Sequence, residues 1–459
     1  MSEALEIWGV KDPNISSQLI LAKTLGYFAD EGIQITYQLL PSGTIMPREI
    51  LRAPQKPFAW TQTVITALIL REQNLDVQMI APLADISSTQ QIIVREDRDI
   101  RLPEDLLGKQ VGMAEGAAIY VALQNMAKDF GINLADISFV NLLPQQQLEA
   151  FRRGEIDAMA CWEPWTTRAI EAGGTLYFSG TYSHIPGYEG PVSWLIDQSL
   201  LMTTADHITH DQEILCAIMR ALSKATTFIA ANLEETARLL TKALSIDSRE
   251  AKHMLEQNRY TTRMDATFRL GIFSIRELLY QSHIISTLPP EEDLYTPELL
   301  KRIDPTLVEI DLPGHTTAPI QQAETVYTLP DARITQRAGS PLTFLLVDDS
   351  SVIREIFKSV ITVLGGELCG EATTGREAIS QYTQLSPDIV IMDLSMPDMT
   401  GIEAIEAILK FDPHASIVVL SGSDFPETRQ DVFDLGAKMF ISKPFKLDVV
   451  TTAIQTIVC

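Results

Sequence analysis

Short runs of apolar residues alternate with amphipathic segments through the last quarter of the chain. Four of these runs are rich in β-branched and other large apolar residues, at 344–347, 389–392, 417–420 and 439–441. Near-continuous apolar runs are typical of strands buried on both faces of a parallel sheet. Residues 352–364 and 401–409, between these runs, have helical spacing. The pattern predicts a doubly wound α/β sheet over residues 341–459, with functional groups at the carboxyl ends of its strands.

The N-terminal block also mixes strands and helices, and its last hundred residues are predicted to be almost entirely helical. A helix is expected early in the block, over residues 18–29. Asn232 and Asp247 each precede good helix formers and are predicted to cap the helices that follow them. The later helices are expected at 212–232, 233–244, 248–257 and 266–282.

A segment without periodicity separates the two blocks. Residues 311–340 are rich in Pro, Gly, Thr and Gln and poor in aromatic residues. Such a composition buries too little apolar surface to pack, so the segment is predicted to be a flexible tether. We therefore divide the chain into a domain at 1–310, a linker at 311–340 and a domain at 341–459.

Composition narrows the possible partners and the compartment. The chain of 459 residues has 60 acidic and 36 basic residues, a formal charge of −24. This balance argues against nucleic-acid binding, which relies on basic residues. The four cysteines lie far apart, without metal-binding spacing, and indicate reduced intracellular thiols.

The N-terminus begins Met-Ser-Glu-Ala-Leu-Glu, with acids where a secretory signal has basic residues. The longest apolar-rich stretches, such as residues 64–70, are too short to span a bilayer. We therefore expect a cytoplasmic protein with no membrane insertion.

Acidic and polar side chains stand where the C-terminal strands end. Asp348 and Asp349 follow the run at 344–347, and Asp393 follows the run at 389–392, 44 residues after Asp349. Ser421 follows the run at 417–420, and Lys443 comes just after the run at 439–441, 22 residues later. Carboxylates gathered at one sheet edge repel one another unless a hard divalent cation such as Mg²⁺ binds there. The arrangement suits phosphoryl transfer, with Asp393 as the nucleophile and Lys443 and Ser421 on the phosphoryl oxygens.

In this order, these residues resemble the receiver domain of two-component response regulators, over residues 341–459. The resemblance implies a flavodoxin-like fold, Mg²⁺ as cofactor, and phosphorylation by a histidine kinase or phosphotransfer protein. Phe440 alone also fits an ordinary edge-strand aromatic residue. The resemblance assigns metal binding to Asp348, Asp349, Asp393 and the backbone carbonyl of Ser395, phosphoryl acceptance to Asp393, and stabilisation or switching to Ser421, Phe440 and Lys443.

Three segments of the N-terminal block have the character of a small-molecule cleft. Residues 8–13 and 112–118 each run from a strand through a turn towards a helix, whose N-terminus presents unpaired amides. Residues 154–165 run through a buried strand into a Trp-Glu-Pro-Trp corner. Aromatic walls with a few polar groups are typical of ligand sites.

Together with residues 25–33, 103–112 and 294–305, these motifs resemble the solute-binding proteins of nitrate, sulfonate and bicarbonate ABC transporters, over about residues 4–310. The resemblance implies a periplasmic-binding-protein-like domain of type II, with two α/β lobes that close on a ligand. The chain would cross between the lobes near 85–89 and return near 193–197.

The resemblance also implies a set of cleft residues. The family often has Ser or Thr in the turn at 116–118, where this chain has Gly-Ala-Ala. Carboxylates at Glu115 and Glu163 would oppose a small anion and favour a neutral or cationic ligand with an apolar body. Trp162 also fits a core aromatic residue, and Glu163 a helix-start acid. The implied set is Asp12, Asn14, Thr61, Thr63, Ser87, Ser88, Gly116, Ala117, Trp162 and Glu163.

The leading functional prediction is a cytoplasmic response regulator, not an enzyme, with a small-molecule-sensing domain and a receiver phosphorylated on Asp393. One alternative is a cleft enzyme like the thiamine-pyrimidine synthases, although these carry a cysteine-rich run and Cys161 stands alone. The other is a protein-docking module whose N-terminal domain binds no ligand. Output through protein contacts or through the N-terminal lobes is expected, since no DNA-binding segment follows the receiver. The sequence leaves a homodimer open.

Overall fold

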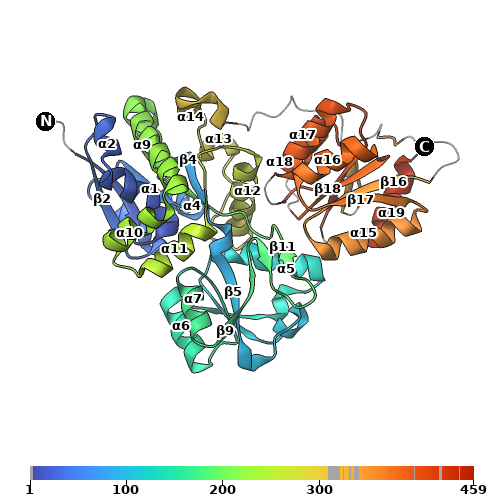
Figure 1. The fold of residues 1–459 in the computed structure, drawn as a ribbon, viewed down its shortest axis with the longest axis horizontal. Coiled ribbons are helices and arrows are strands. Elements are labelled where there is room, and N and C mark those ends of the chain that lie inside the picture. Colours follow the sequence, from blue (N-terminus) through green and yellow to red (C-terminus); the bar gives the residue numbers. More distant parts are fainter. Residues whose placement is uncertain are drawn as a thin grey trace.

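The structure of the protein is a computed structural model that describes residues 4–308, 321–323, 325–329, 332–334, 341–396, 399–422, 426–443 and 445–458. The described chain forms three β-sheets, each with helices on its faces (Figure 1). Two of the sheets belong to the N-terminal domain, and each forms the centre of one lobe. The third belongs to the C-terminal domain.

Lobe I is built on a six-stranded sheet in the order β13-β4-β12-β3-β1-β2. Strands β1 to β3 pair in parallel, and β12 runs antiparallel to both β3 and β4. The strands are β1 (Leu5–Val10), β2 (Ile35–Leu40), β3 (Ala59–Gln62), β4 (Val77–Asp85), β12 (Gln198–Thr204) and β13 (Arg259–Tyr260). Its helices are α1 (Pro13–Thr24), α2 (Tyr27–Asp30), α3 (Met46–Arg52), α4 (Val64–Glu72), α8 (Ala205–His210), α9 (Gln212–Ala231), α10 (Leu233–Leu244), α11 (Ser248–Gln257), α12 (Ala266–Gln281), α13 (Glu291–Leu294) and α14 (Glu298–Ile303).

Lobe II is built on a seven-stranded sheet in the order β11-β10-β9-β5-β8-β6-β7. Its strands are β5 (Gln90–Arg95), β6 (Gln110–Met113), β7 (Ser138–Asn141), β8 (Ala158–Trp162), β9 (Gly174–Ser179), β10 (Tyr182–Ser183) and β11 (Gly190–Pro191). Its helices are α5 (Ile119–Phe130), α6 (Pro144–Arg153) and α7 (Trp165–Glu171).

The chain passes between the lobes at two segments that are hydrogen-bonded to each other. It leaves the lobe I sheet after Asp85 and returns to it at Gln198, so residues 86–89 and 192–197 are the crossings. The Asp197 amide donates to Ser87 Oγ over 2.9 Å, and Ser87 Oγ donates to Asp85 Oδ1 over 2.5 Å. The Ile86 amide donates to the Asp197 carbonyl over 2.9 Å.

Most helix bounds agree with the hydrophobic pattern, but the first helix does not. The segment expected as one helix over 18–29 is two helices, because the chain turns at Gly26, whose φ is 81°. The first of them, α1, also begins earlier than expected, at Pro13. Asp12 caps α1 by accepting the Asn14 amide. Asp247 caps α11 as expected, whereas Asn232 makes no side-chain cap to α10 and instead donates to the Phe228 carbonyl of α9.

Helix α9 corrects the expectation drawn from apolar run length. Among the described residues, it is the one helix long and apolar enough to cross a membrane by length and composition. Polar residues such as Arg220, Ser223 and Lys224 divide its apolar residues into short stretches, so stretch length alone misses it. Half of its most apolar stretch is buried inside lobe I, as in the core helix of a folded domain.

The C-terminal sheet has five parallel strands in the order β17-β16-β18-β19-β20. Its strands are buried on both faces, because Phe344 and Leu346 belong to one apolar cluster while Leu345 and Val347 belong to the other. The strands are β16 (Thr343–Val347), β17 (Glu367–Ala372), β18 (Ile389–Asp393), β19 (Ile417–Ser421) and β20 (Met439–Ser442), and the helices are α15 (Ser351–Val363), α16 (Gly375–Leu385), α17 (Gly401–Phe411), α18 (Pro426–Leu435) and α19 (Leu447–Ile457).

Part of the expected tether belongs to this sheet. Strands β14 (Gln321–Ala323) and β15 (Val326–Thr328) form an antiparallel hairpin, and β15 pairs with the edge strand β20. Val326 and Tyr327 are buried there, which the local composition obscured. The prediction of an unpacked linker over 311–340 is therefore wrong for this hairpin, and residues 309–320 and 335–340 lie outside the described residues.

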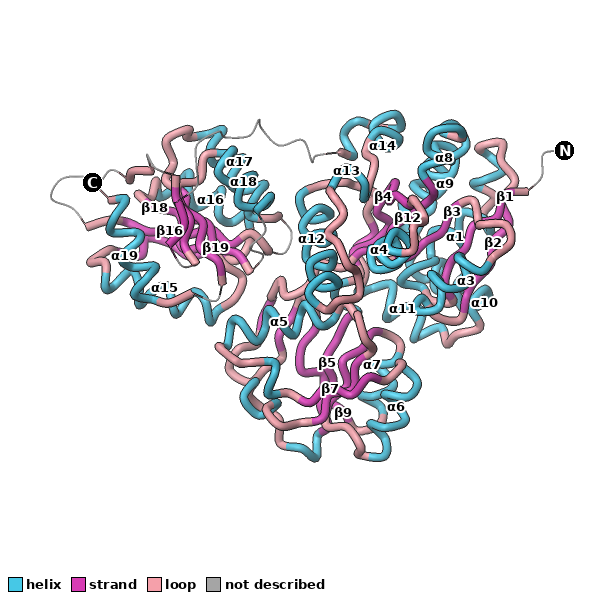
Figure 2. The backbone as a smooth tube through the Cα atoms, turned by 180° about the vertical axis from the view of Figure 1, so that it is seen from behind, coloured by secondary structure: helices cyan, strands magenta, loops and turns pink. Residues whose placement is uncertain are grey.

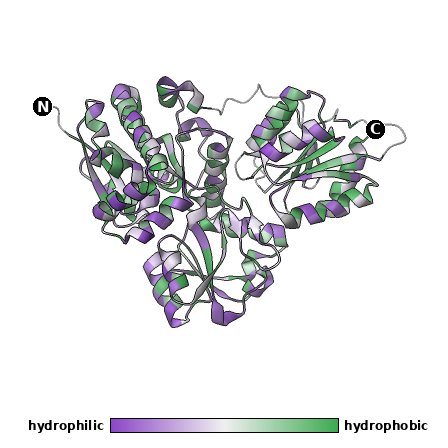
Figure 3. Ribbon diagram, in the orientation of Figure 1, coloured by the Kyte–Doolittle hydropathy of each residue, from purple (hydrophilic) through white to green (hydrophobic). Residues whose placement is uncertain are grey.

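The C-terminal domain lies beside both lobes (Figures 1 and 2). Its neighbours are α12 of lobe I and α5 of lobe II, and α5 contacts α15. The strands at the centre of each sheet are mostly apolar, while the outward faces of the helices carry polar residues (Figure 3).

Candidate functional site

The carboxyl ends of the C-terminal strands bring one ammonium and three carboxylates together. Lys443, just after β20, places its Nζ 3.0 Å from Asp348 Oδ2 and 2.9 Å from Asp393 Oδ1. Asp348 follows β16 and Asp393 ends β18, so parallel pairing of buried apolar strands delivers all three side chains to one edge. Asp393 is only 3% exposed, and Lys443 is 9% exposed. This is the cluster that the sequence pattern predicts.

A single ammonium does not neutralise the carboxylates around it. Burial raises the pKa of Asp393 to about 7, against the opposing attraction of Lys443, and the charge of Asp348 adds to the rise. Burial would lower the pKa of Lys443, but the Asp348, Asp393 and Asp129 carboxylates hold it above its usual range. Lys443 therefore stays charged, and the excess negative charge falls on the carboxyl groups.

Asp349 supplies an acceptor atom with no hydrogen-bond partner. Its side chain is 8% exposed, and its Oδ2 is buried without a partner. Burial and the charges of Asp348 and Asp393 raise its pKa well above the usual range. An orphaned carboxylate oxygen beside two further carboxylates has the chemistry that a hard cation requires. Among the residues that the structure describes, no three His, Cys, Asp or Glu side chains are already gathered in the geometry of a metal site.

The other predicted residues of this edge occupy two different environments. The Ser395 amide donates to Asp393 Oδ2 over 2.8 Å, so the chain after the strand wraps around the carboxylate. Ser421, at the end of β19, is 1% exposed, and its carbonyl accepts the Lys443 amide over 2.8 Å. Phe440 is fully buried and packs edge-on against Tyr327 of β15, with ring centroids 6.1 Å apart.

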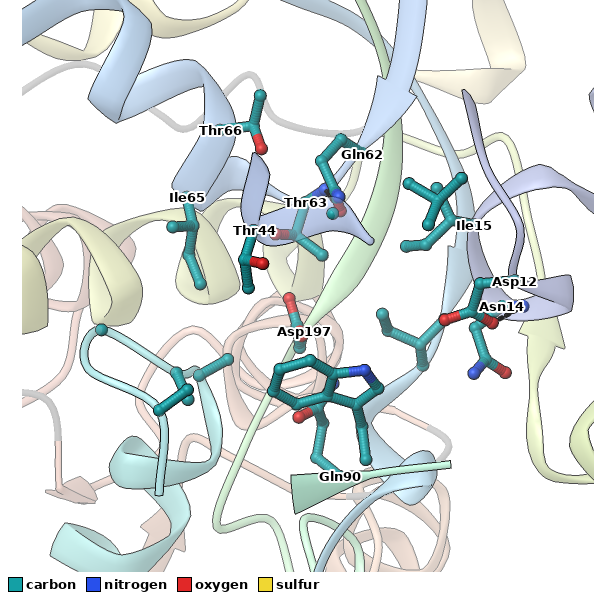
Figure 4. A pocket seen from close by; sticks show the side chains of 18 of the residues that line it. Asp12, Asn14, Ile15, Thr44, Gln62, Thr63, Ile65, Thr66, Gln90 and Asp197 are labelled. Carbon is teal, nitrogen blue, oxygen red and sulfur yellow. Dashed lines mark hydrogen bonds between the residues drawn. The ribbon is translucent and has the colours of Figure 1, made fainter. Parts of the chain in front are cut away.

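A second cavity, of about 180 Å³, lies between the lobes of the N-terminal domain. Its walls come from the first loop of lobe I, from the strand end at Gln62 and Thr63, and from the turn before α5 in lobe II. Figure 4 shows polar groups from opposite walls turned towards the cavity, with the Asp197 carboxyl group pointing towards the side where Thr44 and Thr63 lie.

Six of the ten predicted cleft residues line this cavity. They are Asp12, Asn14, Thr63, Gly116, Ala117 and Trp162. Thr61 is instead fully buried within β3. Ser87 ties the two crossings together, and the Ser88 hydroxyl bonds to Thr181 Oγ1 over 2.7 Å.

Glu163, the remaining predicted cleft residue, joins the lobes at their rim. It is 1% exposed and accepts the Thr167 hydroxyl over 2.8 Å, as a helix-start acid does. His253 of α11 reaches it from lobe I, with Nε2 3.5 Å from Glu163 Oε1, and this contact raises the pKa of His253. Arg168 and Glu250 form a second ion pair across the same gap, over 2.8 Å.

The electrostatics of the cavity are acidic. Asp12, Glu115 and Asp197 line it, and Lys, Arg and His are absent from its lining among the described residues. Burial raises the pKa of Asp197 to about 8, with a further contribution from Asp85. Burial raises the pKa of Asp12 to about 7, partly offset by the Asn14 amide that it caps.

Two buried acceptor atoms in the cavity lining have no partner. They are Asp197 Oδ1 and Gln90 Oε1. The sequence analysis did not select Gln62, Gln90 or Asp197. Asp197 lies within the crossing segment predicted at 193–197, and a charged residue in that segment could have been selected as a cleft residue. Gln62 and Gln90 belong to no motif that marks them. The cavity is therefore equipped to accept hydrogen bonds rather than to neutralise an anion.

Two family models match the chain, one in each domain. The model described as "Response regulator receiver domain" matches residues 344–455. The model described as "NMT1/THI5 like" matches residues 14–236. The expected fusion of the two kinds of domain is thus confirmed.

Curated relatives match the C-terminal domain. The chemotaxis protein CheY of Thermotoga maritima is 45% identical over 113 residues, which are 25% of this chain and 94% of that protein. The chemotaxis protein CheY of Bacillus subtilis is 39% identical over 111 residues, covering 24% of this chain and 92% of that protein.

Solved structures match the two lobes. The periplasmic aliphatic sulphonate binding protein SsuA of Escherichia coli aligns with a TM-score of 0.54 at 17% identity, over 65% of this chain and 93% of its own. A putative periplasmic sulfonate-binding protein of Methylobacillus flagellatus aligns with a TM-score of 0.56 at 15% identity, over 66% and 94%. These likenesses show a periplasmic-binding-protein-like fold and confirm the predicted fold class.

Proposed function

Because this chain belongs to the response-regulator receiver family through its C-terminal domain, we propose that Asp393 accepts a phosphoryl group from a histidine kinase or phosphotransfer protein. The observation that carries this proposal is the buried cluster in which Lys443 Nζ lies 2.9 Å from Asp393 Oδ1. The chain is a phosphoacceptor rather than a catalyst that acts on other molecules.

The transfer needs positioning and charge compensation more than covalent chemistry from the protein. A carboxylate oxygen of Asp393 forms a bond to phosphorus as the bond from phosphorus to the donor's histidine nitrogen breaks, giving an acyl phosphate without oxidation or reduction. Lys443 stays charged and compensates the added negative charge. The Ser421 hydroxyl, at the neighbouring strand end, donates to a phosphoryl oxygen.

Mg²⁺ is the cation that these side chains fit best. Asp349 would bind it through its unpartnered Oδ2, together with Asp348, Asp393 and the Ser395 carbonyl. When bound, it supplies charge neutralisation around the phosphoryl group.

The first test is phosphorylation of the full chain by a small acyl phosphate donor with Mg²⁺, followed by intact mass. We expect one phosphoryl group on the wild-type chain and none on Asp393→Asn, with Asp412→Asn as a matched control that still accepts it. Equal labelling of the wild type and Asp393→Asn would refute Asp393 as the acceptor.

We further propose that the N-terminal domain senses a small molecule that is neutral or cationic, with N–H donors and an apolar body. The unpartnered acceptors Asp197 Oδ1 and Gln90 Oε1 support this class. The structural neighbours named above bind sulfonates, which are anions. Glu115 in the lining, and the absence of Lys, Arg and His from the described lining residues, oppose such a ligand.

Thermal unfolding of the full chain against a panel of amines, pyrimidines, amino acids, nitrate, bicarbonate and sulfonates tests this ligand class. Binding at 100 times Kd adds about 2.7 kcal/mol to stability. We expect upward shifts among amines or pyrimidines. Shifts only with the anions would contradict the proposed class, and no shift at all would favour the docking-module alternative.

A cleft enzyme is the weaker alternative. Cys161 is fully buried within β8, and burial raises the pKa of its thiol, so it offers neither a nucleophile nor a metal ligand. Because a histidine kinase phosphorylates its partners in the cytoplasm, we place the chain there.

A further inference from the structure

One face of the N-terminal domain closes over the phosphoacceptor cluster. The space above Asp393 is only about 30 Å³, room for one or two water molecules. The receiver supplies one side of its wall and the N-terminal domain the other. The receiver residues are Asp349, Ser350, Asp393, Ser395, Gly422 and Lys443, and those of the N-terminal domain are Asn125, Lys128, Asp129, Ser193 and Trp194.

Specific polar contacts hold lobe II against this edge. Lys128 Nζ donates to the carbonyl of Gly422 over 2.8 Å, next to the switch hydroxyl of Ser421. Ser193 of the crossing lines the same small cavity as Asp349. The N-terminal domain therefore lies against both the metal-binding acids and the switch strand.

Lobe II also places a carboxylate beside Lys443. Trp194 Nε1 donates to Asp129 Oδ2 over 2.8 Å, and Asn125 Nδ2 donates to the Trp194 carbonyl over 2.8 Å. The charge of Asp129 acts on both Lys443 and Asp393. An approaching phosphoryl group would meet this fixed negative charge.

Lobe I contacts the receiver at a second point. Arg269 of α12 forms a largely buried ion pair with Asp431 of α18. Leu270 of the same helix, together with Ile196 of the crossing, packs into the receiver's apolar cluster. The receiver is thus docked on both lobes at once. A change in the angle between the lobes cannot preserve both contacts.

Two elements run directly from the ligand cavity to the phosphoacceptor cluster. Helix α5 follows the cavity-lining turn at residues 114–118 and carries Asn125, Lys128 and Asp129 on its later turns, a helix of about 18 Å. The crossing segment carries Asp197 in the cavity wall and Ser193 at Asp349.

We propose that the N-terminal domain is a cap on the phosphoacceptor site, and that a ligand-driven change in the angle between the lobes removes it. In the capped state shown here, α5 and residues 193–194 exclude both a phosphodonor and the face of a partner kinase. Ligand binding and phosphorylation are then coupled, and by linkage each changes the equilibrium of the other. This inference rests on Asp393 being the phosphoacceptor.

A disulfide that locks the cap tests it in the full chain. A side chain at Gly422 would place its Cβ 3.8 Å from Asn125 Cγ, the position that the Sγ of Asn125→Cys would take, so Asn125→Cys with Gly422→Cys needs only a small side-chain movement to bridge. The donor is acetyl phosphate with Mg²⁺: its P–O bond breaks, acetate leaves with the electron pair, and Asp393 gains the phosphoryl group. We expect at least tenfold slower labelling of the oxidised double variant than of the same protein after reduction.

The two single-cysteine variants are the matched controls and should label at the same rate with and without oxidant. Equal rates for the bridged and reduced double variant would overturn the cap. No labelling of the reduced protein or of the wild type would instead count against Asp393 phosphorylation itself.

Exchanging the charges of the ion pair between Arg269 and Asp431 tests the cap independently of whether the disulfide forms. Asp431→Arg places like charges together at α12 and should speed labelling at least threefold. Adding Arg269→Asp restores opposite charges and should return the rate towards that of the wild type. An unchanged rate in Asp431→Arg would contradict the cap.

Discussion

At the scale of single residues, buried polar groups with incomplete partners are the common property of both sites. Lys443 faces Asp348 and Asp393 at hydrogen-bond distance, and Asp197 in the cavity has an acceptor atom without a partner. Buried groups of this kind cost stability unless something binds them. Both sites therefore hold interactions that only a bound ion, phosphoryl group or ligand completes.

Asp197→Asn tests the buried proton in the cavity. With a pKa of about 8 in the folded chain, against its ordinary value of 3.8, Asp197 holds a proton that the unfolded chain has released. The wild type should therefore lose up to about 1.4 kcal/mol of stability per pH unit between about pH 4 and 8, relative to the variant. Thermal unfolding of both proteins from pH 5 to 9 measures this difference. The exposed Asp136→Asn is the control, and a parallel pair of curves for Asp197→Asn and wild type would contradict the shift.

Gly401→Ala tests the close approach behind the phosphoacceptor. A Cβ there would lie 1.9 Å from the Asp393 carbonyl oxygen, which is backbone and cannot turn away. We expect a loss of about 3 kcal/mol in receiver stability. Native-state hydrogen exchange of β18 measures it, with Glu406→Ala on the exposed face of α17 as a control expected within about 0.5 kcal/mol. Unchanged exchange in Gly401→Ala would show that the loop yields.

At the scale of elements, buried strands were predictable and edge elements were not. The runs beginning at Phe344, Ile389, Ile417 and Met439 are apolar at nearly every position, so they were recognisable as buried parallel strands. Recognising them was enough to predict that Asp393 and Lys443 lie at the same edge of the sheet. Strand β17 has half-buried and polar positions, and lacks that signal. The β14–β15 hairpin was hidden in a Pro- and Gly-rich segment, because pairing with β20 rather than its own composition stabilises it.

The cavity lining was predictable only where a motif marked it. Asp12 and Trp162 lie in recognisable turns, whereas Gln62 and Gln90 become neighbours only when the two lobes meet. Lys128 and Asp129 reach the receiver from a helix almost 300 residues distant from Gly422, a contact that no local pattern encodes.

Tyr327→Ala tests whether the hairpin is part of the receiver. Tyr327 is 7% exposed, covers Phe440 and lies beneath Arg429, whose guanidinium carbon is 4.2 Å from its ring centroid. Its removal should cost about 3 kcal/mol and accelerate amide exchange in β20. Phe411→Ala, on an exposed aromatic residue of α17, is the control, and unchanged exchange in β20 would mean that the hairpin is not needed there.

The rim contact between the lobes predicts a shifted histidine. The Glu163 side chain raises the pKa of His253 above 6.5, so the attraction is complete at low pH and is lost as the pH rises through the raised value. An NMR titration of His253 should give a midpoint above 6.5 that falls in Glu163→Gln. His210, which bonds within α8 and not across the rim, is the internal reference. An identical His253 midpoint in both proteins would show that the lobes do not meet at this rim.

At the scale of the whole molecule, the three sheets form one assembly in which the receiver touches both lobes. If phosphorylation and docking exclude each other, a phosphoryl mimic should loosen the contact. Beryllium fluoride with Mg²⁺ should accelerate amide exchange in residues 119–130 and 192–197, and leave α10, on the far side of lobe I, unchanged. Exchange that is unchanged at α5 would contradict the exclusion, and Asp393→Asn should abolish the response.

The hairpin on β20 also sets the length of the linker between the domains, because the linker ends where the hairpin begins. Only twelve residues separate Val308 from Gln321, a span that cannot exceed about 45 Å when fully extended. A receiver released from the lobes therefore stays at a local concentration in the millimolar range. At that concentration, the capping surfaces need only a weak intrinsic affinity to be mostly docked. Lengthening this linker would shift the equilibrium from the docked to the released receiver without changing any contact between the domains.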